Sequence, residues 1–197
     1  MNNIIATLES IEKLSHEELH ALNQLKYYIK RKTLKRGHYL YESGDTPNFV
    51  AFIEFGLLRH FVTDNNDNEK IIQFYKENAF VHDCHCYYEQ KPVDYSVQAL
   101  EDCELSCFIL SDVEHLRTEF PVFEKIGRKM LEGHLTNHRD HISLLMKFNP
   151  EQRYKYVLEN QPELVQRVTV THLAQYLDLS RETLSRMRAK VVEKNIL

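Results

Sequence analysis

Residues 170–190 read VTHLAQYLDLSRETLSRMRAK, and this stretch decides the interpretation of the whole chain. Its apolar residues recur at helical spacing, which predicts two short helices that share one buried face. They are Leu173, Ala174, Leu177, Leu179, Leu184 and Met187. Asp178 tolerates the left-handed conformation that such a turn requires, and the hydroxyl of Ser180 can cap the second helix. The stretch therefore predicts a helix-turn-helix.

The second helix of this motif presents a polar face once its apolar residues are buried. Arg pairs bidentately with guanine in the DNA major groove, and Glu accepts from cytosine. We therefore expect base contacts from Arg181, Glu182, Ser185 and Arg186, and phosphate contacts from Thr171, Thr183, Arg188 and Lys190. The alternative is an ordinary helical hairpin with a charged outer face.

The composition is that of a folded protein of one or two domains. The chain has 197 residues, of which 43% are hydrophobic and 27% charged. No basic segment followed by an apolar run opens it, and the most apolar run, Phe49 to Leu58, is interrupted and too short to cross a bilayer. We expect a cytoplasmic protein without a membrane partner. Its 4 cysteines predict no disulfide framework in that compartment.

Charge is distributed unevenly along the chain. The net charge is −4, but the residues from Asn149 onward carry 8 Lys and Arg against 6 Asp and Glu. Basic charge therefore gathers where the predicted recognition helix lies, which favours a nucleic-acid partner.

The middle of the chain has the pattern of an antiparallel β-roll. From Thr33 to Leu110, short extended runs alternate with turn residues. One run alternates apolar and polar residues and so predicts one buried and one wet face; its apolar members are Val93, Tyr95, Val97 and Ala99. Before the roll, Ser15 to Glu18 form a capping box that predicts a helix.

Helical patterning resumes after the roll. Ser111 to Glu114 form a second capping box, and beyond Pro121 one helix is expected to run to Phe148, roughly 40 Å in length. Its apolar residues follow heptad-like spacing, which predicts pairing with a second copy of the chain. This predicted dimer seam comprises Leu131, Leu135, His138, Ile142 and Leu145. Asn149 and Pro150 then begin a new helix and mark a domain hinge.

This order of parts resembles the Crp/Fnr family of bacterial transcription regulators. The resemblance rests on GHYLYESGDTP at 37–47, on GLLR at 56–59 and on RETLSR at 181–186. It implies an α+β fold in which a jelly-roll-like sensor occupies 1–118, a dimerisation helix 119–148 and a helix-turn-helix domain 149–197. In the family, the residues that stand at Arg181, Glu182 and Arg186 contact bases.

The resemblance also implies a function. It is that of a homodimeric, sequence-specific regulator that binds a palindromic operator in double-stranded DNA, with RNA polymerase as a further candidate partner. Family members that bind cyclic AMP carry Gly-Glu and then Arg-Ser or Arg-Thr around the phosphate. Here His82-Asp83 and Val93-Asp94 stand at those places. A buried phosphate needs a cationic partner, which Val93 does not supply. We therefore expect a degenerate effector pocket that does not respond to cyclic AMP, and the effector stays unknown.

A metal site is the main alternative. His82, Cys84, His85, Cys86 and Glu89 lie close together in sequence, and a cupin-like metal enzyme or a metal or redox sensor would use such a cluster. On a strand, however, the odd separation of His82 and His85 places them on opposite faces. We expect no metal, no cofactor and no catalytic residues. Cys103 and Cys107 share a strand face with apolar residues and are interpreted as core thiols.

Three histidines lie on adjacent turns of the long helix, at His134, His138 and His141. Two interpretations stay open for them. They are surface residues, or they form a protonation or metal switch at the two-fold axis.

Overall fold

A computed structural model describes every residue except 1, 12–13, 84–88, 90 and 195–197. The chain divides into two compact units. The first comprises Met1–His60 and Phe74–Leu135, and the second comprises Phe61–Gln73 and Thr136–Leu197. Among the described residues, no helix is both long enough and apolar enough to cross a membrane.

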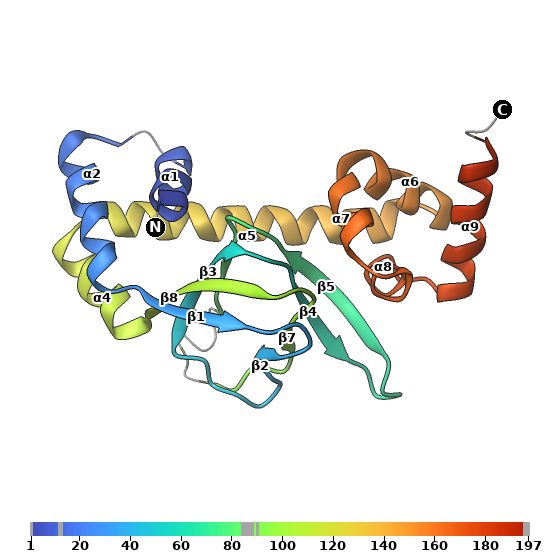
Figure 1. Ribbon diagram of the computed structural model, residues 1–197, viewed down its shortest axis with the longest axis horizontal. Helices are drawn as coiled ribbons and strands as arrows, with labels where there is room; N and C mark the ends of the chain where they lie inside the picture. The colour runs from blue at the N-terminus through green and yellow to red at the C-terminus, as the bar shows by residue number, and fades with distance from the viewer. Residues whose placement is uncertain (1, 12–13, 84–88, 90, 195–197) are drawn as a thin grey trace. The chain divides into compact units, whose positions relative to one another are not determined.

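The strands form two four-stranded sheets, with orders β1-β8-β3-β6 and β2-β7-β4-β5 (Figure 1). Their bounds are β1 Lys30–Leu34, β2 Tyr39–Tyr41, β3 Phe49–Phe55, β4 Leu58–Thr63, β5 Glu69–Tyr75, β6 Phe80–Val81, β7 Ser96–Ala99 and β8 Cys103–Ile109. β8 pairs antiparallel with both β1 and β3, and a bulge between Ile53 and Phe55 shifts the register of β3. The predicted antiparallel roll is confirmed.

Alternation along the strands separates two cores. In β3, Ala51 and Ile53 belong to the core between the sheets, whereas Phe52 belongs to a second core made with helices. The interior core also contains Val93, Val97 and Ala99, so the predicted alternation of this run holds, although β7 itself begins only at Ser96.

Four helical segments and the start of a long fifth helix build the second core. They are α1 Asn2–Ile11, α2 His16–Leu22, the 3-10 helix η1 Asn23–Tyr27, α4 Leu110–Glu119 and α5 Val122–Lys147. Ile4, Leu22, Leu116 and Ile126 belong to this core together with Phe52 of β3. α1 was not anticipated from the sequence.

The helix starts test the capping predictions. At α2 the capping box is confirmed, because Ser15 Oγ accepts from Glu18 N at 3.2 Å and Ser15 N donates to Glu18 Oε2 at 2.7 Å. The capping box predicted at Ser111 is wrong. α4 begins at Leu110, its N-cap residue is Ile109, and no side chain caps it. Leu110 N donates instead to Asn48 O at 2.9 Å, so a contact distant in sequence sets this boundary.

The remaining helices follow in short succession. They are α6 Pro150–Asn160, α7 Pro162–Arg167, α8 Val170–Tyr176 and α9 Arg181–Lys194. α5 has 26 residues, which confirms the single long helix, and it starts after Pro121. Asn149 caps α6 as predicted, because its side chain accepts from Gln152 N at 3.0 Å and Pro150 occupies the first turn.

Gly56 lies where the backbone and the space both require glycine. Its φ is +105°, and a Cβ there would lie 2.5 Å from Cys103 Sγ and 2.8 Å from Asp102 O. We expect Gly56→Ala to lower the free energy of unfolding by roughly 2–4 kcal/mol, because left-handed strain and overpacking add. Gly44→Ala is the control, since its φ is +96° but a Cβ there meets open space. Urea denaturation should show a clearly lower midpoint for Gly56→Ala than for Gly44→Ala; equal midpoints would contradict the close contact.

Candidate nucleic-acid interface and sensor pocket

The predicted helix-turn-helix is present at α8 and α9. Thr169 caps α8 by accepting from His172 N at 3.1 Å, and Ser180 Oγ accepts from Thr183 N at 3.1 Å at the start of α9. Between the helices, Asp178 adopts φ +52°, the left-handed conformation expected of this position. Four residues close the shared core: Leu173, Ala174, Leu177 and Leu184, all at most 2% exposed.

Because Leu184 is buried, the polar residues on the other side of α9 face solvent. Arg181, Glu182, Ser185 and Arg186 are all exposed, as the sequence predicted for the base-contacting set. Arg186 Nη2 lies 3.5 Å from Thr183 Oγ1 and keeps its remaining donors for a partner. Of the residues predicted to contact phosphates, Thr171 is exposed, Thr183 and Arg188 are half-buried, and the side chain of Lys190 lies outside the described part. One helix start therefore presents two cations, a carboxylate and a hydroxyl to solvent.

Arg153 of α6 fixes the motif to the end of α5. Its guanidinium donates to Leu177 O at 3.0 Å, to Leu145 O at 2.7 Å and to Phe148 O at 2.9 Å. Charge-assisted bonds of this kind are stronger than neutral ones. Arg153 thus positions the turn of the helix-turn-helix. Sequence reasoning missed it, because its partners are backbone carbonyls that leave no motif.

Contacts with β5 hold the same motif from another side. Each ring nitrogen of His141 faces a backbone carbonyl oxygen, Nδ1 that of Ile72 at 2.7 Å and Nε2 that of Tyr176 at 2.9 Å. Lys70 pairs with Asp178, and Gln175 Nε2 donates to Glu69 Oε2 at 3.2 Å. Burial lowers the pKa of His141, although the two carbonyls oppose this shift. His141 is therefore a packed bridging residue, as opposed to a free surface histidine.

An apolar stripe on α5 is left exposed. Leu131 is 39%, Leu135 63%, Ile142 57% and Met146 81% exposed. Residues four and seven apart share one face of an α-helix, so the four form one row. Within the predicted seam, His138 and Leu145 are half-buried. Met146, which the sequence-based seam omitted, extends the row.

Aromatic rings fill the interior of the roll in the first unit. The His60 ring lies 4.1 Å from that of Tyr95 and stacks on Tyr75 at 6.1 Å. Tyr95 Oη donates to Asp83 Oδ2 at 2.7 Å, and burial raises the pKa of Tyr95. Arg59 is 5% exposed and donates through Nε to Gln98 Oε1 at 2.9 Å.

The predicted degenerate pocket maps partly onto this interior. His82 packs edge-on against His134 at 4.6 Å, and burial lowers the pKa of His82. Val93 is buried in the interior core, whereas Asp94 is exposed. The structure thus brings Asp83 and Val93 to the roll interior, places His82 against His134 of α5 and leaves Asp94 outside. Cys84, His85 and Cys86 of the candidate metal cluster lie outside the described residues.

Cys103 and Cys107 are buried, free thiols, as the strand pattern predicted. Burial raises the pKa of Cys103 to about 11 and also raises that of Cys107. Both are therefore thiols at neutral pH, and neither is an activated nucleophile.

Comparison with known proteins agrees with a sensor roll followed by a helix-turn-helix. The cyclic nucleotide-binding domain model matches residues 31–119. The fumarate and nitrate reduction regulatory protein of Yersinia pestis is 27% identical over 193 residues, covering 90% of this chain and 75% of its own length. The transcriptional regulatory protein btr of Bordetella pertussis is 25% identical over 179 residues, covering 85% and 73%.

The structural match is of the same kind. FixK2 from Bradyrhizobium japonicum superposes with a TM-score of 0.73 at 18% identity, covering 86% of this chain and 87% of its own. Fold and site thus define a transcription regulator with a cyclic nucleotide-binding-domain roll. Its roll matches the cyclic nucleotide-binding domain family, and the chain as a whole is similar to transcription regulators of the Crp/Fnr type. These relatives give no support to the alternative of a cupin-like enzyme or metal sensor.

Proposed function

We propose that this chain forms a homodimer through α5 and places two copies of α9 in successive major grooves of a palindromic operator, without requiring cyclic AMP. The exposed face of α9 carries this proposal. Arg181, Glu182 and Arg186 project from the first turns of a helix whose other side is held by Leu184. Two-fold symmetry of the protein then requires half-sites about one helical turn apart.

The same features indicate which part of the chain performs each function. We assign residues 1–118 to the sensor, 119–148 to dimerisation and 149–197 to DNA binding. We also propose that the protein acts by regulating transcription and that it has no catalytic centre. RNA polymerase is a further proposed partner. Thr171, Thr183, Arg188 and Lys190 are assigned to phosphates, and Arg153 to holding the motif in place.

Selection of bound sequences from random double-stranded DNA tests the proposal. We expect an enriched, palindromic motif whose half-sites are centred about 10 base pairs apart. Full-length protein should shift that sequence and leave a scrambled duplex of equal length largely free at the same concentration. Enrichment of no motif, or of one without two-fold symmetry, contradicts the proposed mode of binding.

The roll interior supports independence from cyclic nucleotides. His60 and Asp83 each contact Tyr95 there, and Val93 stands where the family carries its phosphate-binding Arg. An effector changes DNA affinity only through its differential affinity for the two states of the protein. We expect added cyclic AMP or cyclic GMP to leave DNA affinity within about twofold. Calorimetry and DNA-shift titrations check this; micromolar binding with a tenfold gain in DNA affinity would show that Arg59 or a histidine replaces the missing cation.

A further inference from the structure

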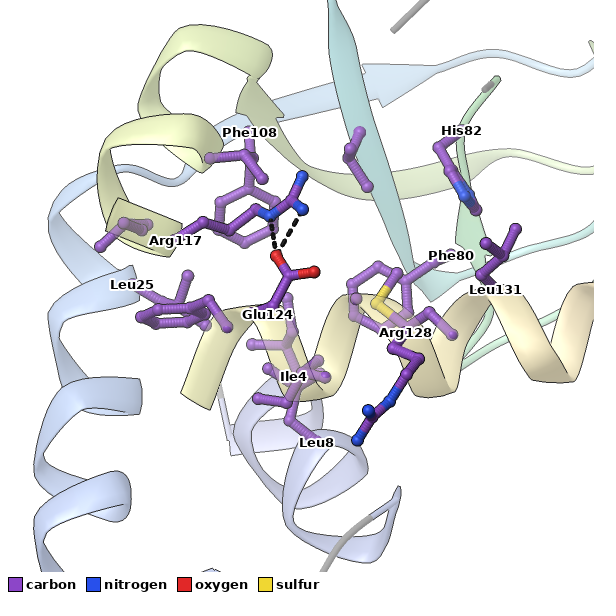
Figure 2. A pocket seen from close by; sticks show the side chains of 17 residues that line it. Ile4, Leu8, Leu25, Phe80, His82, Phe108, Arg117, Glu124, Arg128 and Leu131 are labelled. Carbon is purple, nitrogen blue, oxygen red and sulfur yellow. Dashed lines mark hydrogen bonds and ion pairs between the residues drawn. The ribbon is translucent and has the colours of Figure 1, made fainter. Parts of the chain in front are cut away.

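The first unit contains an apolar cavity outside the roll interior (Figure 2). Its volume is about 300 Å³, and it lies among α1, η1, α4, α5 and the helical side of the sheet. Its lining includes Leu8, Leu25, Val50, Phe80 and Ile126. In β3, Val50 lines the cavity while its neighbour Ala51 belongs to the interior core. The sheet therefore lies between most of this cavity and the interior core, although His82 of the predicted effector pocket also lines the cavity.

The charged residues of the lining are two arginines and one glutamate. Arg117 Nε donates to Glu124 Oε2 at 2.7 Å, and Arg117 Nη1 donates to Glu114 Oε1 at 3.0 Å, so two carboxylates already engage this guanidinium. Arg128 lies on the α1 side of α5, away from the Arg117–Glu124 pair (Figure 2). It is exposed and makes no ion pair with another described residue. The cavity thus has an apolar body, one end at which the arginine is already paired, and a second arginine, Arg128, without an ion-pair partner among the described residues.

We propose that this cavity binds a small apolar carboxylate of the medium-chain fatty acid type, with its chain among the apolar residues and its carboxylate at Arg128. A volume of about 300 Å³ lies at the small end of ligand sites, which span roughly 300–1,000 Å³. An apolar chain gains free energy by leaving water, and the one cation without a carboxylate partner selects an anionic head group. A cationic amphiphile would be repelled by Arg128.

The site is linked to the dimer seam through α5. Leu131 lines the cavity and is also the first residue of the exposed apolar stripe. Ile126 and Gly127, one turn earlier, line the cavity as well. A bound ligand therefore contacts the helix turns that lead into the proposed dimer interface. An effect on DNA binding rests on the proposed function, whereas ligand binding itself does not.

Gly127 offers a way to fill the cavity without disturbing the backbone. A Cβ at Gly127 meets nothing within 4 Å, and the same holds for Gly133 on the same helix, which does not line the cavity. Leu is a better helix former than Gly, so neither Gly127→Leu nor Gly133→Leu should weaken α5. Gly133→Leu is therefore a matched control for the filled variant.

Isothermal calorimetry with the full-length chain and sodium decanoate is the test. We expect one decanoate per chain with a Kd below about 100 µM. Gly127→Leu should weaken binding at least about tenfold, whereas Gly133→Leu should bind as the unchanged protein does. Arg128→Gln should weaken binding about two- to fivefold, as expected of an exposed ion pair, and Arg128→Lys should weaken it less. Melting temperatures of the variants confirm that each is folded.

Three outcomes would overturn the proposal. The first is absence of saturable decanoate binding to the unchanged protein. The second is equal affinity in Gly127→Leu and Gly133→Leu, which would place the ligand elsewhere. The third is equal affinity for decanoate and 1-decanol, which would remove the role of the carboxylate and Arg128. Decanoate binding without a change in operator affinity leaves the site intact and contradicts only its coupling to DNA.

Discussion

Leu135→Glu is expected to convert the protein into a monomer that no longer binds its operator specifically. Leu135 is 63% exposed at the centre of the α5 stripe, between Leu131 and Ile142. Large apolar side chains in one helical row are stabilised when a second helix covers them, by about 1.5–3 kcal/mol for each fully buried residue. The substitution removes the apolar contact of residue 135 in both protomers. It also places two negative charges near each other across the symmetric interface.

Loss of the dimer should affect DNA binding more than any single contact. One protomer holds one recognition helix, and a palindromic operator derives its affinity from two linked half-sites. We therefore expect specific binding to fall to the non-specific level while the folded content of the chain is retained. Light scattering should give the mass of one chain for Leu135→Glu and of two chains for the unchanged protein.

Asn137→Glu is the matched control for this prediction. Asn137 is exposed on the same helix, and it lies two residues from Leu135 and hence on nearly the opposite face. Asn137→Glu adds the same charge outside the stripe, so it should leave both the mass of the dimer and its DNA affinity unchanged. A dimer of unchanged mass for Leu135→Glu would contradict the assignment of the stripe as the dimer interface.

Arg186→Ala and Arg181→Ala are each expected to cost about 1–3 kcal/mol against the selected operator and to relax its preference at one G·C pair. Both side chains are exposed at the start of α9, and an arginine in the major groove can pair bidentately with guanine. Affinity for a scrambled duplex should change far less, because a lost base contact removes specificity. Competition titrations with single-position operator variants check which base pair each arginine contacts.

Two further variants separate base contacts from charge effects. Arg188→Ala should weaken binding to all sequences. It should also make the slope of log affinity against log salt concentration shallower, by the amount expected for about one phosphate contact. Lys155→Ala removes one positive charge from α6, where Lys155 pairs with Glu159, and should change neither affinity nor salt dependence. If Arg181→Ala and Arg186→Ala weakened binding uniformly across sequences, as Arg188→Ala should, their assignment to bases would be wrong.

The sequence by itself determined the features whose hydrogen bonds and contacts close within a few residues. Ser15, Asn149 and Ser180 cap helices by accepting from a backbone N–H three residues later, so each was visible in the local pattern. The position of Leu184 also follows from helical periodicity, and its burial leaves Arg181 and Arg186 exposed. The candidate DNA interface was therefore predictable almost completely.

Contacts between segments distant in sequence decided the rest. Helix α1 was not predicted, although Ile4 and Leu8 stand at helical spacing, and both are buried in the helical core. The start of α4 depends on the carbonyl of Asn48, and the clamp of Arg153 on backbone carbonyls of α5 and of the α8–α9 turn. Only the tertiary structure could supply these contacts, and with them the cavity, because backbone carbonyls and open space carry no residue type that a sequence pattern can reveal.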